Sequence, residues 1–454
     1  MMITSMPLVS LQEPKDVSID DIEAELEQVW QMQSGEDGAT ATRATTFSII
    51  IYEPDETQPL LSALGFYTGP VDGIAGSRTQ AAVTAAQKAY GFQESGMMTP
   101  AFEQRLRQEY QNAKEAGNIS ETARAVVQQY SPDVGGSIVA DAIAASNPCR
   151  IITLCPIQGE DEGVTAQVSA YCPIQKKSKT SNLVCCEYIT LRGTSAALER
   201  IGGVVAALTV SGLPKYVWWK ACPEPDYGLF KRLNQFCDSF IFDSSTFNQP
   251  QNHLVQLSSL IAQGASVADL NWGRLSAWQE LTAEAFDPPS RRSGLLEIDQ
   301  VTLDYEKGNP AQAFMYLGWI ASRLQWKPIG YKYEGGDYDI RRVKFLSSEQ
   351  REISAELAAI PTADFGSILG DLISLRLSST NLQADCCTVL CSETTGCMRM
   401  EAGGGAQACS IRQVSPLQDQ ATDQLLGRQL QRGGMDSLYE ESMAVTHHIL
   451  QLAD

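Results

Sequence analysis

The chain has 454 residues, of which 43% are hydrophobic and 19% are charged, a balance typical of a folded protein rather than a disordered one. Its 34 Lys and Arg against 54 Asp and Glu give a net charge of −20. This charge argues against nucleic acid or an anionic membrane as the main partner, because both attract clustered basic residues. At roughly 150 residues per domain, the length predicts about three domains.

The sequence predicts a cytoplasmic protein. No apolar run approaches the ~20 residues that span a bilayer, and the N-terminus lacks the basic and apolar regions of a signal peptide. The twelve Cys are therefore expected to be mostly reduced thiols. With only His253, His447 and His448 and no phosphate-binding, nucleophile-elbow or HExxH motif, we expect no catalytic residue, cofactor or metal.

Hydrophobic periodicity predicts the N-terminal elements in chain order. They are a helix at 18–33, a polar linker at 34–45, a strand at 46–52, a separate compact segment from about 58, a polar helical stretch at 111–130, a helix at 136–147 and a strand at 150–155. We assign 1–55 to the N-terminal helix and first strand of an α/β core, and 56–112 to an inserted module.

Strands and helices then alternate. Strands are expected at 183–192, 216–220, 239–243 and 295–305, and helices at 194–208, 226–236, 250–263, 269–286 and 309–325. This rhythm predicts that 134–330 forms the α/β core, with a mainly parallel, doubly wound sheet. Beyond it, strands at 341–346, 367–377, 386–390, 398–401 and 408–414 and a final helix at 418–452 predict a β-rich α+β C-terminal domain, 331–454.

The segment 58–106 resembles the small three-helix peptidoglycan-binding-like module. The motif residues that carry the resemblance include Gly69, Asp72, Gly73, Gly76 and Thr79. The two glycines Gly69 and Gly73 permit tight turns, Asp72 can cap the local backbone, and Thr79 begins an amphipathic helix. We expect a scaffold or protein-contact role for the module rather than glycan binding, since fold does not fix function.

Five stretches in order carry a broader resemblance: DIEAELEQVW, ATRATTFSIIIYE, NPCRIITLCP, SGLPKYVWWK and VADLNWGRLSAWQE. Together they are similar to the OpcA family of glucose-6-phosphate dehydrogenase assembly proteins, in its cyanobacterial form with the inserted module. The resemblance implies a non-enzymatic cytoplasmic partner that binds glucose-6-phosphate dehydrogenase, raises its activity in the oxidative pentose phosphate pathway, and is controlled by transient contact with thioredoxin. The alternative is a carbohydrate- or cell-wall-binding protein acting through 58–106. A nucleotide-sugar-binding enzyme is a weaker third possibility.

The run 269–278 supplies candidate partner-binding residues, Trp272, Arg274 and Trp278, because Trp and Arg dominate interface hot spots. A buried Trp pair with Arg274 in a local ion pair remains the alternative. A small-molecule pocket is a weaker possibility than solvated loops where the strands of an open α/β sheet end, at Cys222, Glu224, Asp226 and 243–245.

Cys391 and Cys397 are the candidate redox pair. Five polar or small residues ending in Gly396 separate them, which is typical of a hairpin loop. The two cysteines are then expected to face each other and form a reversible, thioredoxin-reducible disulfide. Competing pairs join Cys386 or Cys387 to Cys409. Another group is expected to be mostly buried, inert thiols: Cys149, Cys155, Cys172, Cys185, Cys186 and Cys237.

Overall fold

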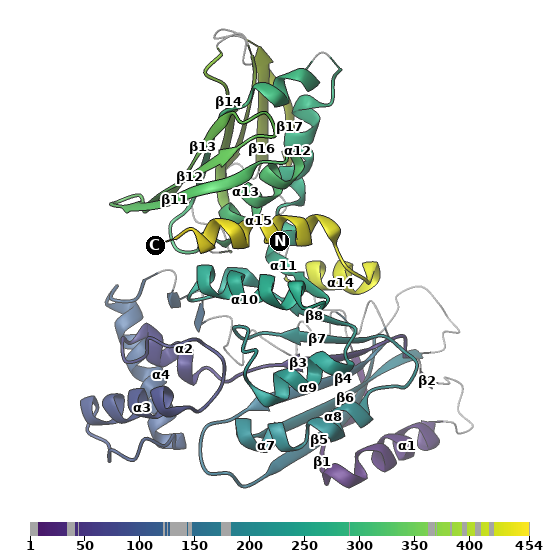
Figure 1. Cartoon of the computed structure of the whole chain (residues 1–454). Helices are drawn as coiled ribbons and strands as arrows, with labels where there is room; N and C mark the ends of the chain where they lie inside the picture. The colour runs from purple at the N-terminus through teal and green to yellow at the C-terminus, as the bar shows by residue number, and fades with distance from the viewer. Residues whose placement is uncertain are drawn as a thin grey trace. The chain divides into compact units, whose positions relative to one another are not determined.

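The computed structural model describes residues 8–33, 41–43, 45–120, 123–124, 126–127, 143, 148–173, 183–289, 291–361, 368, 370–381, 384–392, 397–404, 410–416 and 422–453. The chain divides into two compact units (Figure 1). The first unit comprises Met1–Phe242 and Thr422–Gly434, and the second comprises Asp243–Ala421 and Met435–Asp454. The expected helix at 136–147 lies outside the described residues except for Ile143.

A mixed sheet is the centre of the first unit. Its strands are β1 (Leu8–Val17), β2 (Ala41–Arg43), β3 (Ser48–Tyr52), β4 (Arg150–Pro156), β5 (Val164–Pro173), β6 (Leu183–Gly193), β7 (Lys215–Trp219) and β8 (Ser239–Phe242). Within this unit they follow the order β1-β5-β6-β4-β3-β7-β8, and β2 pairs with β6. The run β6-β4-β3-β7-β8 is parallel, whereas β1 and β5 join antiparallel. All five residues of β3 are buried, as expected for a parallel strand covered on both faces.

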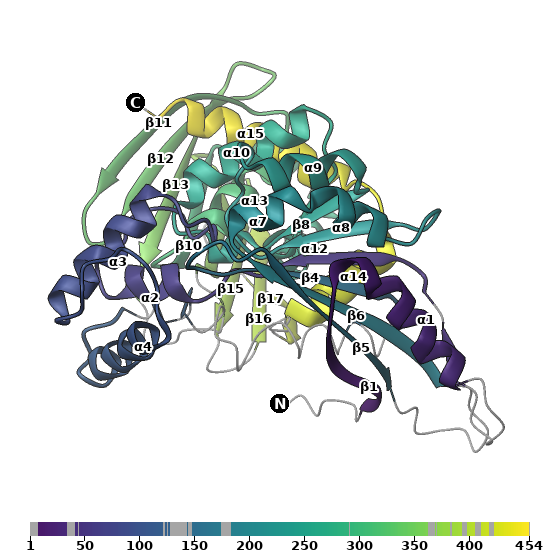
Figure 2. The same cartoon turned by 90° about the horizontal axis from the view of Figure 1, so that it is seen from below.

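Short helices complete the α/β part of the first unit (Figure 2). They are the 3₁₀ turn η1 (Ile19–Asp21), α1 (Ile22–Gln33), α7 (Ser195–Arg200), α8 (Gly202–Leu208), α9 (Gly228–Phe236) and α14 (Thr422–Arg432). The single helix expected at 194–208 is divided at Ile201, before two glycines. The expected final helix is likewise divided, because Gly433 and Gly434 follow α14 with positive φ angles.

The inserted module contributes α2 (Thr57–Ala63), α3 (Ser77–Ala89) and α4 (Pro100–Glu115) to the first unit. Leu61, Val83, Phe102 and Leu106 are almost completely buried in its own small core. The Thr99 side chain accepts a hydrogen bond from the Phe102 backbone N–H and so caps α4. The strands that flank the module in sequence, β3 and β4, are hydrogen-bonded parallel neighbours.

An extended sheet is the centre of the second unit. Its strands are β10 (Gln300–Glu306), β11 (Lys327–Gly335), β12 (Ile340–Leu346), β13 (Glu352–Ile360), β14 (Leu372–Ser378), β15 (Asp385–Ser392), β16 (Cys397–Gly404) and β17 (Ser410–Pro416). The order is β11-β12-β13-β10-β14-β15-β16-β17. Only the β10–β13 pair among the described strands of this sheet is parallel.

Several helices belong to the second unit. With the short strand β9 (Val267–Asp269) they are η2 (Ser244–Thr246), α10 (Pro250–Ala262), α11 (Leu270–Arg274), α12 (Ser276–Phe286), η3 (Arg292–Glu297), α13 (Ala311–Arg323) and α15 (Ser437–Gln451). A Cβ on Gly318 of α13 would lie 2.5 Å from the Ser442 carbonyl oxygen and from Thr446 Oγ1 of α15. The glycine therefore permits close packing of these two helices.

The expected domain boundary at 330 is wrong. The second unit begins at Asp243, so the helices α10 to α13 belong with the β-rich sheet rather than with the α/β core. The strand expected at 295–305 is β10, and it pairs with β13 and β14 of the second sheet. The alternation of helix and strand continues through 243–325, which is why composition alone does not reveal the change of sheet.

Candidate functional site

Arg274 of α11 lies at the centre of a buried polar network in the second unit. Its Nη1 and Nη2 atoms donate to the two carboxylate oxygens of Asp243 at 2.7 and 2.8 Å, a bidentate pair. Both side chains are only 6% exposed. Burial alone would raise the pKa of Asp243, but the charge and hydrogen bonds of Arg274 lower it below the ordinary value. Asp243 therefore stays ionised.

Neighbouring side chains fix this ion pair in place. Asp269 Oδ1 accepts from the backbone N–H groups of Ser244 and Asn271 at 3.0 and 2.9 Å. Gln312 Nε2 donates to Asn271 Oδ1 at 2.9 Å, and Asn309 Nδ2 donates to the Ser244 carbonyl at 2.9 Å. Burial, with a further contribution from the charge of Asp243, raises the pKa of Asp269 to about 6. We call the residues of these two paragraphs the Arg274 network.

The candidate partner-binding residues are part of this interior. Trp272 is 7% exposed and Trp278 is 4% exposed. Trp272 Nε1 donates to Asp436 Oδ2 at 3.0 Å, and the Trp278 ring contacts Tyr316 edge-on. The interpretation of Trp272, Arg274 and Trp278 as surface contacts is therefore wrong. The alternative, buried tryptophans with Arg274 in a local ion pair, is the arrangement observed.

A turn of the module, Val71–Gly73, contacts the α/β sheet of the first unit. Its three consecutive carbonyl oxygens each accept a hydrogen bond from a residue at or just beyond the end of a strand of that sheet. The Val71 oxygen accepts from the Cys222 backbone N–H at 3.1 Å. The Asp72 oxygen accepts from Tyr52 Oη at 3.0 Å, and the Gly73 oxygen from Ser195 Oγ at 3.0 Å. The turn is thereby held by hydrogen bonds that require no particular side chain at 71 or 73.

These contacts lie at the carboxyl ends of parallel strands. Tyr52 is the last residue of β3, while Ser195 and Cys222 follow β6 and β7. A Cβ on Gly73, whose φ is +76°, would lie 2.5 Å from Pro54 Cβ and 3.0 Å from Cγ of Pro156, the last residue of β4. Open α/β sheets bind their ligands at this edge. In this chain the module turn is hydrogen-bonded to this edge, beside Cys222.

Gln58 of α2 organises the turn from within the module. Its Nε2 donates to Asp72 Oδ1 at 2.7 Å and to Thr79 Oγ1 at 3.2 Å. Its Oε1 accepts from the backbone N–H groups of Asp72 and Gly73 at 2.8 and 2.7 Å. Three of the predicted motif residues, Asp72, Gly73 and Thr79, are thus gathered around a glutamine that sequence reasoning did not single out.

The other two motif glycines have different surroundings. A Cβ on Gly69 would lie 2.5 Å from Tyr67 Oη, which itself donates to the Pro70 carbonyl at 2.8 Å. Gly76 precedes α3, and a Cβ there would meet open space. Gly69 is therefore required for packing inside the module, whereas nothing in the structure explains Gly76.

Glu224, in the loop after β7, meets the module turn through its side chain. Its carboxyl group interacts with the Asp72 carboxyl group. Burial, together with the charge of Asp72, raises the pKa of Glu224 to about 7. Burial also raises the pKa of Asp72. Two carboxyl groups in contact cannot both ionise without repulsion, so one of them retains a proton near neutral pH.

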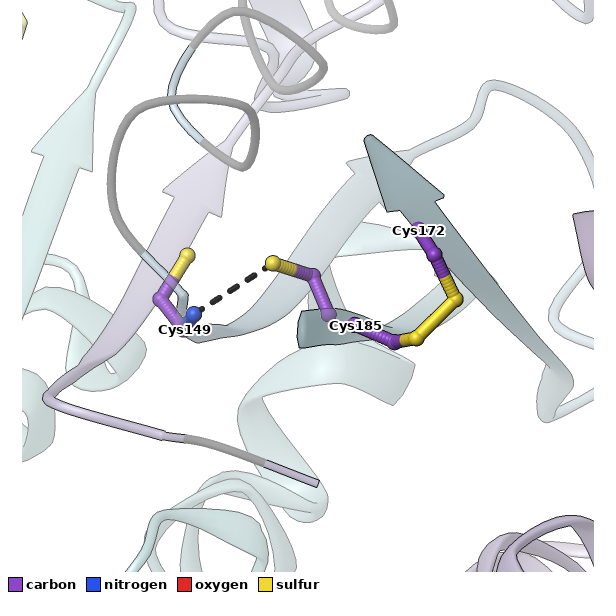
Figure 3. The surroundings of a disulfide bond; sticks show 4 residues. Cys149, Cys172 and Cys185 are labelled. Atoms are coloured by element: carbon purple, nitrogen blue, oxygen red, sulfur yellow. Dashed lines mark hydrogen bonds between the residues drawn. A yellow bond between two sulfur atoms is a disulfide. The ribbon is translucent and has the colours of Figure 1, made fainter. Parts of the chain in front are cut away.

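Cys172 and Cys185 form a disulfide bond (Figure 3). Their Cα atoms are 4.1 Å apart, on the neighbouring antiparallel strands β5 and β6. The inert thiols expected for most of this cysteine group are therefore not found at these two positions. The pairing of β5, a strand that the sequence analysis does not predict, with β6 brings them together. Beside them, the Cys149 backbone N–H donates to Cys186 Sγ at 3.4 Å, and both of these cysteines are buried.

The backbone register places the predicted redox pair one residue out of direct opposition. Cys391 is paired with Met398, and Ser392 is paired with Cys397. The expectation that Cys391 and Cys397 face each other across the hairpin is therefore wrong. The side chains of both cysteines lie outside the described residues, as does the whole of Cys409. A disulfide between Cys391 and Cys397 thus remains a prediction.

Within the described parts of the chain, no group of three or more His, Cys, Asp or Glu residues is placed to hold a metal ion. The helices described there are also too short or too polar to cross a membrane.

Family comparisons place most of the chain among glucose-6-phosphate dehydrogenase subunit proteins. The family model described as the glucose-6-phosphate dehydrogenase subunit N-terminal domain matches residues 140–259, and that for the C-terminal domain matches 265–443. A peptidoglycan binding domain model matches residues 54–106. The two subunit models account for most of the α/β and β-rich parts, and the third for the module.

Two curated relatives identify the family of this chain. The OxPP cycle protein OpcA of Synechocystis sp. is 61% identical, over 98% of this chain and 94% of the relative. The corresponding protein of Nostoc punctiforme is 56% identical, over 100% and 97%. This chain therefore belongs to the OpcA family.

Solved structures give weaker similarities. An oxidoreductase from Sinorhizobium meliloti has a TM-score of 0.37 at 9% identity, over 56% of this chain and 81% of that one. A 3-ketoreductase from Actinomadura kijaniata has a TM-score of 0.36 at 9% identity, over 58% and 81%. Similarities at this level establish neither a shared fold nor an activity.

Proposed function

We propose that this chain is a non-catalytic cytoplasmic partner of glucose-6-phosphate dehydrogenase, which it helps to assemble and activates allosterically in the oxidative pentose phosphate pathway. The observation that carries the proposal is the match of two glucose-6-phosphate dehydrogenase subunit models to residues 140–259 and 265–443. The contacts of the module turn with the carboxyl edge of the first sheet support it, because open α/β sheets bind their ligands at this edge.

The test is to mix the purified chain with the dehydrogenase of the same organism. We expect the two proteins to co-elute from a sizing column and the apparent KM for glucose 6-phosphate to fall. The dehydrogenase with an unrelated acidic protein is the control, since a net charge of −20 alone can alter an assay. If the proteins elute separately and the KM is unchanged, the chain is not an activator of this enzyme.

The two family models of dehydrogenase subunits do not cover the module residues, which supports a modulating role for the module. We propose that the remainder of the chain binds the dehydrogenase and that the module tunes the response. Residues 56–112 would be replaced by a flexible linker, and the variant assayed for folding and binding. Because deletion also removes the contacts of the Val71–Gly73 turn, a loss of stability is expected. If the folded remainder fails to bind, this assignment is wrong.

We further propose that thioredoxin tunes the activation through Cys391 and Cys397. In this step the dithiol of thioredoxin gives two electrons and two protons to the disulfide, leaving two thiols in this chain and a disulfide in thioredoxin. The two cysteines lie on adjacent, hydrogen-bonded strands but one residue out of opposition, so the disulfide requires the end of the hairpin to shift its register by one residue.

The two cysteine pairs can be distinguished directly. Peptide mass spectrometry of the oxidised protein without reductant shows which pairs form. Activation is then assayed with and without reduced thioredoxin for Cys391→Ser/Cys397→Ser and, as the matched control, for Cys172→Ser/Cys185→Ser. We expect the first double variant to lose the redox response and the second to retain it. The reverse result would assign the response to the Cys172–Cys185 disulfide.

The family match at 54–106 favours a second candidate, binding of cell-wall glycan by the module. Sedimentation with purified peptidoglycan tests it, using the chain without 56–112 as the control. We expect no difference between the two, because Asp72 and Gly73 of the module motif already contact Glu224, Tyr52 and Ser195.

A further inference from the structure

The Cys172–Cys185 disulfide lies on the face of the first-unit sheet that α1 covers. Successive side chains of a strand point to opposite faces, so Cys185 and Glu187 of β6 share one face. Glu187 Oε1 accepts a hydrogen bond from Trp30 Nε1 of α1 at 2.7 Å, which identifies this face as the one beneath α1. On β5, Ala170 is paired with Glu187, and Cys172 lies two positions further along. The disulfide and the contact with α1 are therefore neighbours on one surface of the sheet.

Both half-cystines are buried. Cys172 is 0% exposed and Cys185 is 1% exposed, whereas a reductant must bring its thiolate directly onto a disulfide sulfur. The apolar residues Ile22, Leu26 and Val29 of α1 are buried as well, and α1 packs against β5 and β1 (Figure 2). Access to the disulfide from this face therefore requires α1 to move.

Four polar side chains hold α1 on the sheet. Arg150, at the start of β4, donates from Nη2 to Glu23 Oε2 of α1 at 3.2 Å and from Nε to Glu187 Oε2 at 2.8 Å. Glu187 in turn accepts from Trp30, two turns further along α1. The side chains of Arg150 and Glu187 are 3% and 1% exposed. We call Glu23, Trp30, Arg150 and Glu187 the α1 clasp, and its member Glu187 is two residues from Cys185.

We propose that Cys172–Cys185 is a second redox site of this chain and that α1 is its lid: a dithiol reductant reaches the disulfide only when α1 lifts from β5 and β6, and the α1 clasp sets how often this happens. The proposal concerns the isolated chain. It depends neither on the dehydrogenase being the partner nor on a disulfide between Cys391 and Cys397.

The reaction itself is ordinary thiol–disulfide exchange. A thiolate of the reductant attacks one sulfur of the disulfide, forms a mixed disulfide and displaces the other cysteine as a thiolate. The second thiol of the reductant, as a thiolate, then displaces the first cysteine. Two electrons and two protons pass from the dithiol to Cys172 and Cys185, which become thiols, and the reductant becomes a disulfide. Because opening precedes attack, the observed rate is the rate in the open state multiplied by the open fraction.

The first measurement compares the folded and unfolded chain. The whole oxidised protein is treated with dithiothreitol, samples are acid-quenched and alkylated, and mass spectrometry follows the peptides of Cys172 and Cys185 over time. A parallel reaction in denaturing urea gives the rate without the lid. We expect reduction of the folded chain to be at least about tenfold slower, since local opening of a packed helix is a minor state. Equal rates would overturn the proposal.

Variants of the α1 clasp test whether α1 controls access. Trp30→Phe keeps an aromatic ring but removes the hydrogen bond to Glu187, so reduction should become about three- to tenfold faster. Glu23→Gln weakens the partly exposed pair with Arg150 and should give a smaller gain, about two- to fivefold. Glu27→Gln is the matched control, because Glu27 is exposed on the same helix and the substitution is the same. Its rate should equal that of the unmodified chain.

A second reporter separates release of α1 from unfolding of the whole unit. Cys222 is buried beyond β7, and its alkylation by iodoacetamide without reductant reports on opening of the sheet elsewhere. We expect Trp30→Phe and Glu23→Gln to leave the alkylation rate of Cys222 unchanged. The proposal is overturned if Cys222 accelerates in parallel with reduction, if neither clasp variant accelerates reduction, or if Glu27→Gln accelerates it as much as Glu23→Gln does.

Discussion

Asp243 in the second unit and Glu224 in the first are both carboxyl groups drawn out of water, yet their pKa values move in opposite directions. Burial opposes ionisation at both sites. At Asp243 the bidentate guanidinium of Arg274 more than offsets burial, and the pKa falls. At Glu224 the principal partner is another carboxyl group, and the pKa rises to about 7. The partner, rather than the extent of burial, decides whether a buried acid is a permanent charge or a titrating one.

The difference separates two kinds of structural role. The Arg274 network keeps its ion pair at every pH near neutrality, so it acts as a fixed framework for α11 and the segments around it. The contact between Asp72 and Glu224 changes its charge within the same range, so it can vary with conditions. The predictions below test this comparison, beginning with the largest expected effect.

Arg274→Ala should destabilise the protein by about 3–5 kcal/mol, because it leaves Asp243 buried and without its cation. Chemical denaturation at pH 7 measures the change in the free energy of unfolding. The control is Arg342→Ala on the surface of β12, where the pairs with Glu334 and Glu356 are solvent-exposed and the loss should be about 0–1 kcal/mol. Equal, small losses in both variants would mean that the Arg274 network is not a framework.

Asp269→Asn should raise the free energy of unfolding, relative to the unmodified chain, by more at pH 8 than at pH 5. The folded-state pKa of Asp269 is raised to about 6, so its ionisation disfavours folding as pH rises from 3.8 through 6. Asn retains an acceptor for the Ser244 and Asn271 backbone N–H groups but carries no charge.

We expect a gain of roughly 1–3 kcal/mol at pH 8 relative to pH 5, measured by urea denaturation at both pH values. Asp226→Asn, fully exposed, is the control and should show no such gain. The comparison is contradicted if Asp269→Asn loses stability equally at both pH values, because Asp269 would then contribute as a charge.

Gly73→Ala should lower the stability of the protein more than Gly65→Ala does, although both glycines have positive φ angles, +76° and +81°. The cost of the backbone conformation, roughly 1–2 kcal/mol, is common to both. Only at Gly73 does the added Cβ approach Pro54 and Pro156, while Gly65 has nothing within 4 Å. The difference in melting temperature isolates the contact with the strand ends. Equal melting temperatures would mean that the turn is not tightly docked.

The continuously apolar strands of the fold could be predicted from sequence, whereas strands that contain both apolar and polar residues could not. The run SIIIY of β3 is continuous and apolar, and its position was expected. The described strands that the sequence does not predict are β1, β2, β5, β9, β11 and β13. β13, with the sequence EISAELAAI, contains Glu and Ala residues that favour helices, and it becomes a strand because β10 and β12 pair with it. Tertiary pairing overrides local propensity there.

The candidate sites also depend on tertiary contacts that local sequence does not reveal. The module motif was recognised, but Gln58 and Glu224 carry no local signal for their contacts with Asp72. Trp272 and Arg274 have the composition of an interface, and only the fold shows that they are buried. Cys172 and Cys185 are separated by 13 positions, and their pairing depends on β5, which the sequence did not reveal.

The most direct test of the central claim, that this chain acts by binding the dehydrogenase while the Arg274 network serves as its framework, is hydrogen exchange of the chain with and without a saturating amount of that enzyme. The account predicts slower exchange in surface segments of the chain and unchanged exchange in peptides covering 269–278. The contradicting result is an exchange pattern identical with and without the dehydrogenase, or protection confined to 269–278, which would return the Arg274 network to the partner surface.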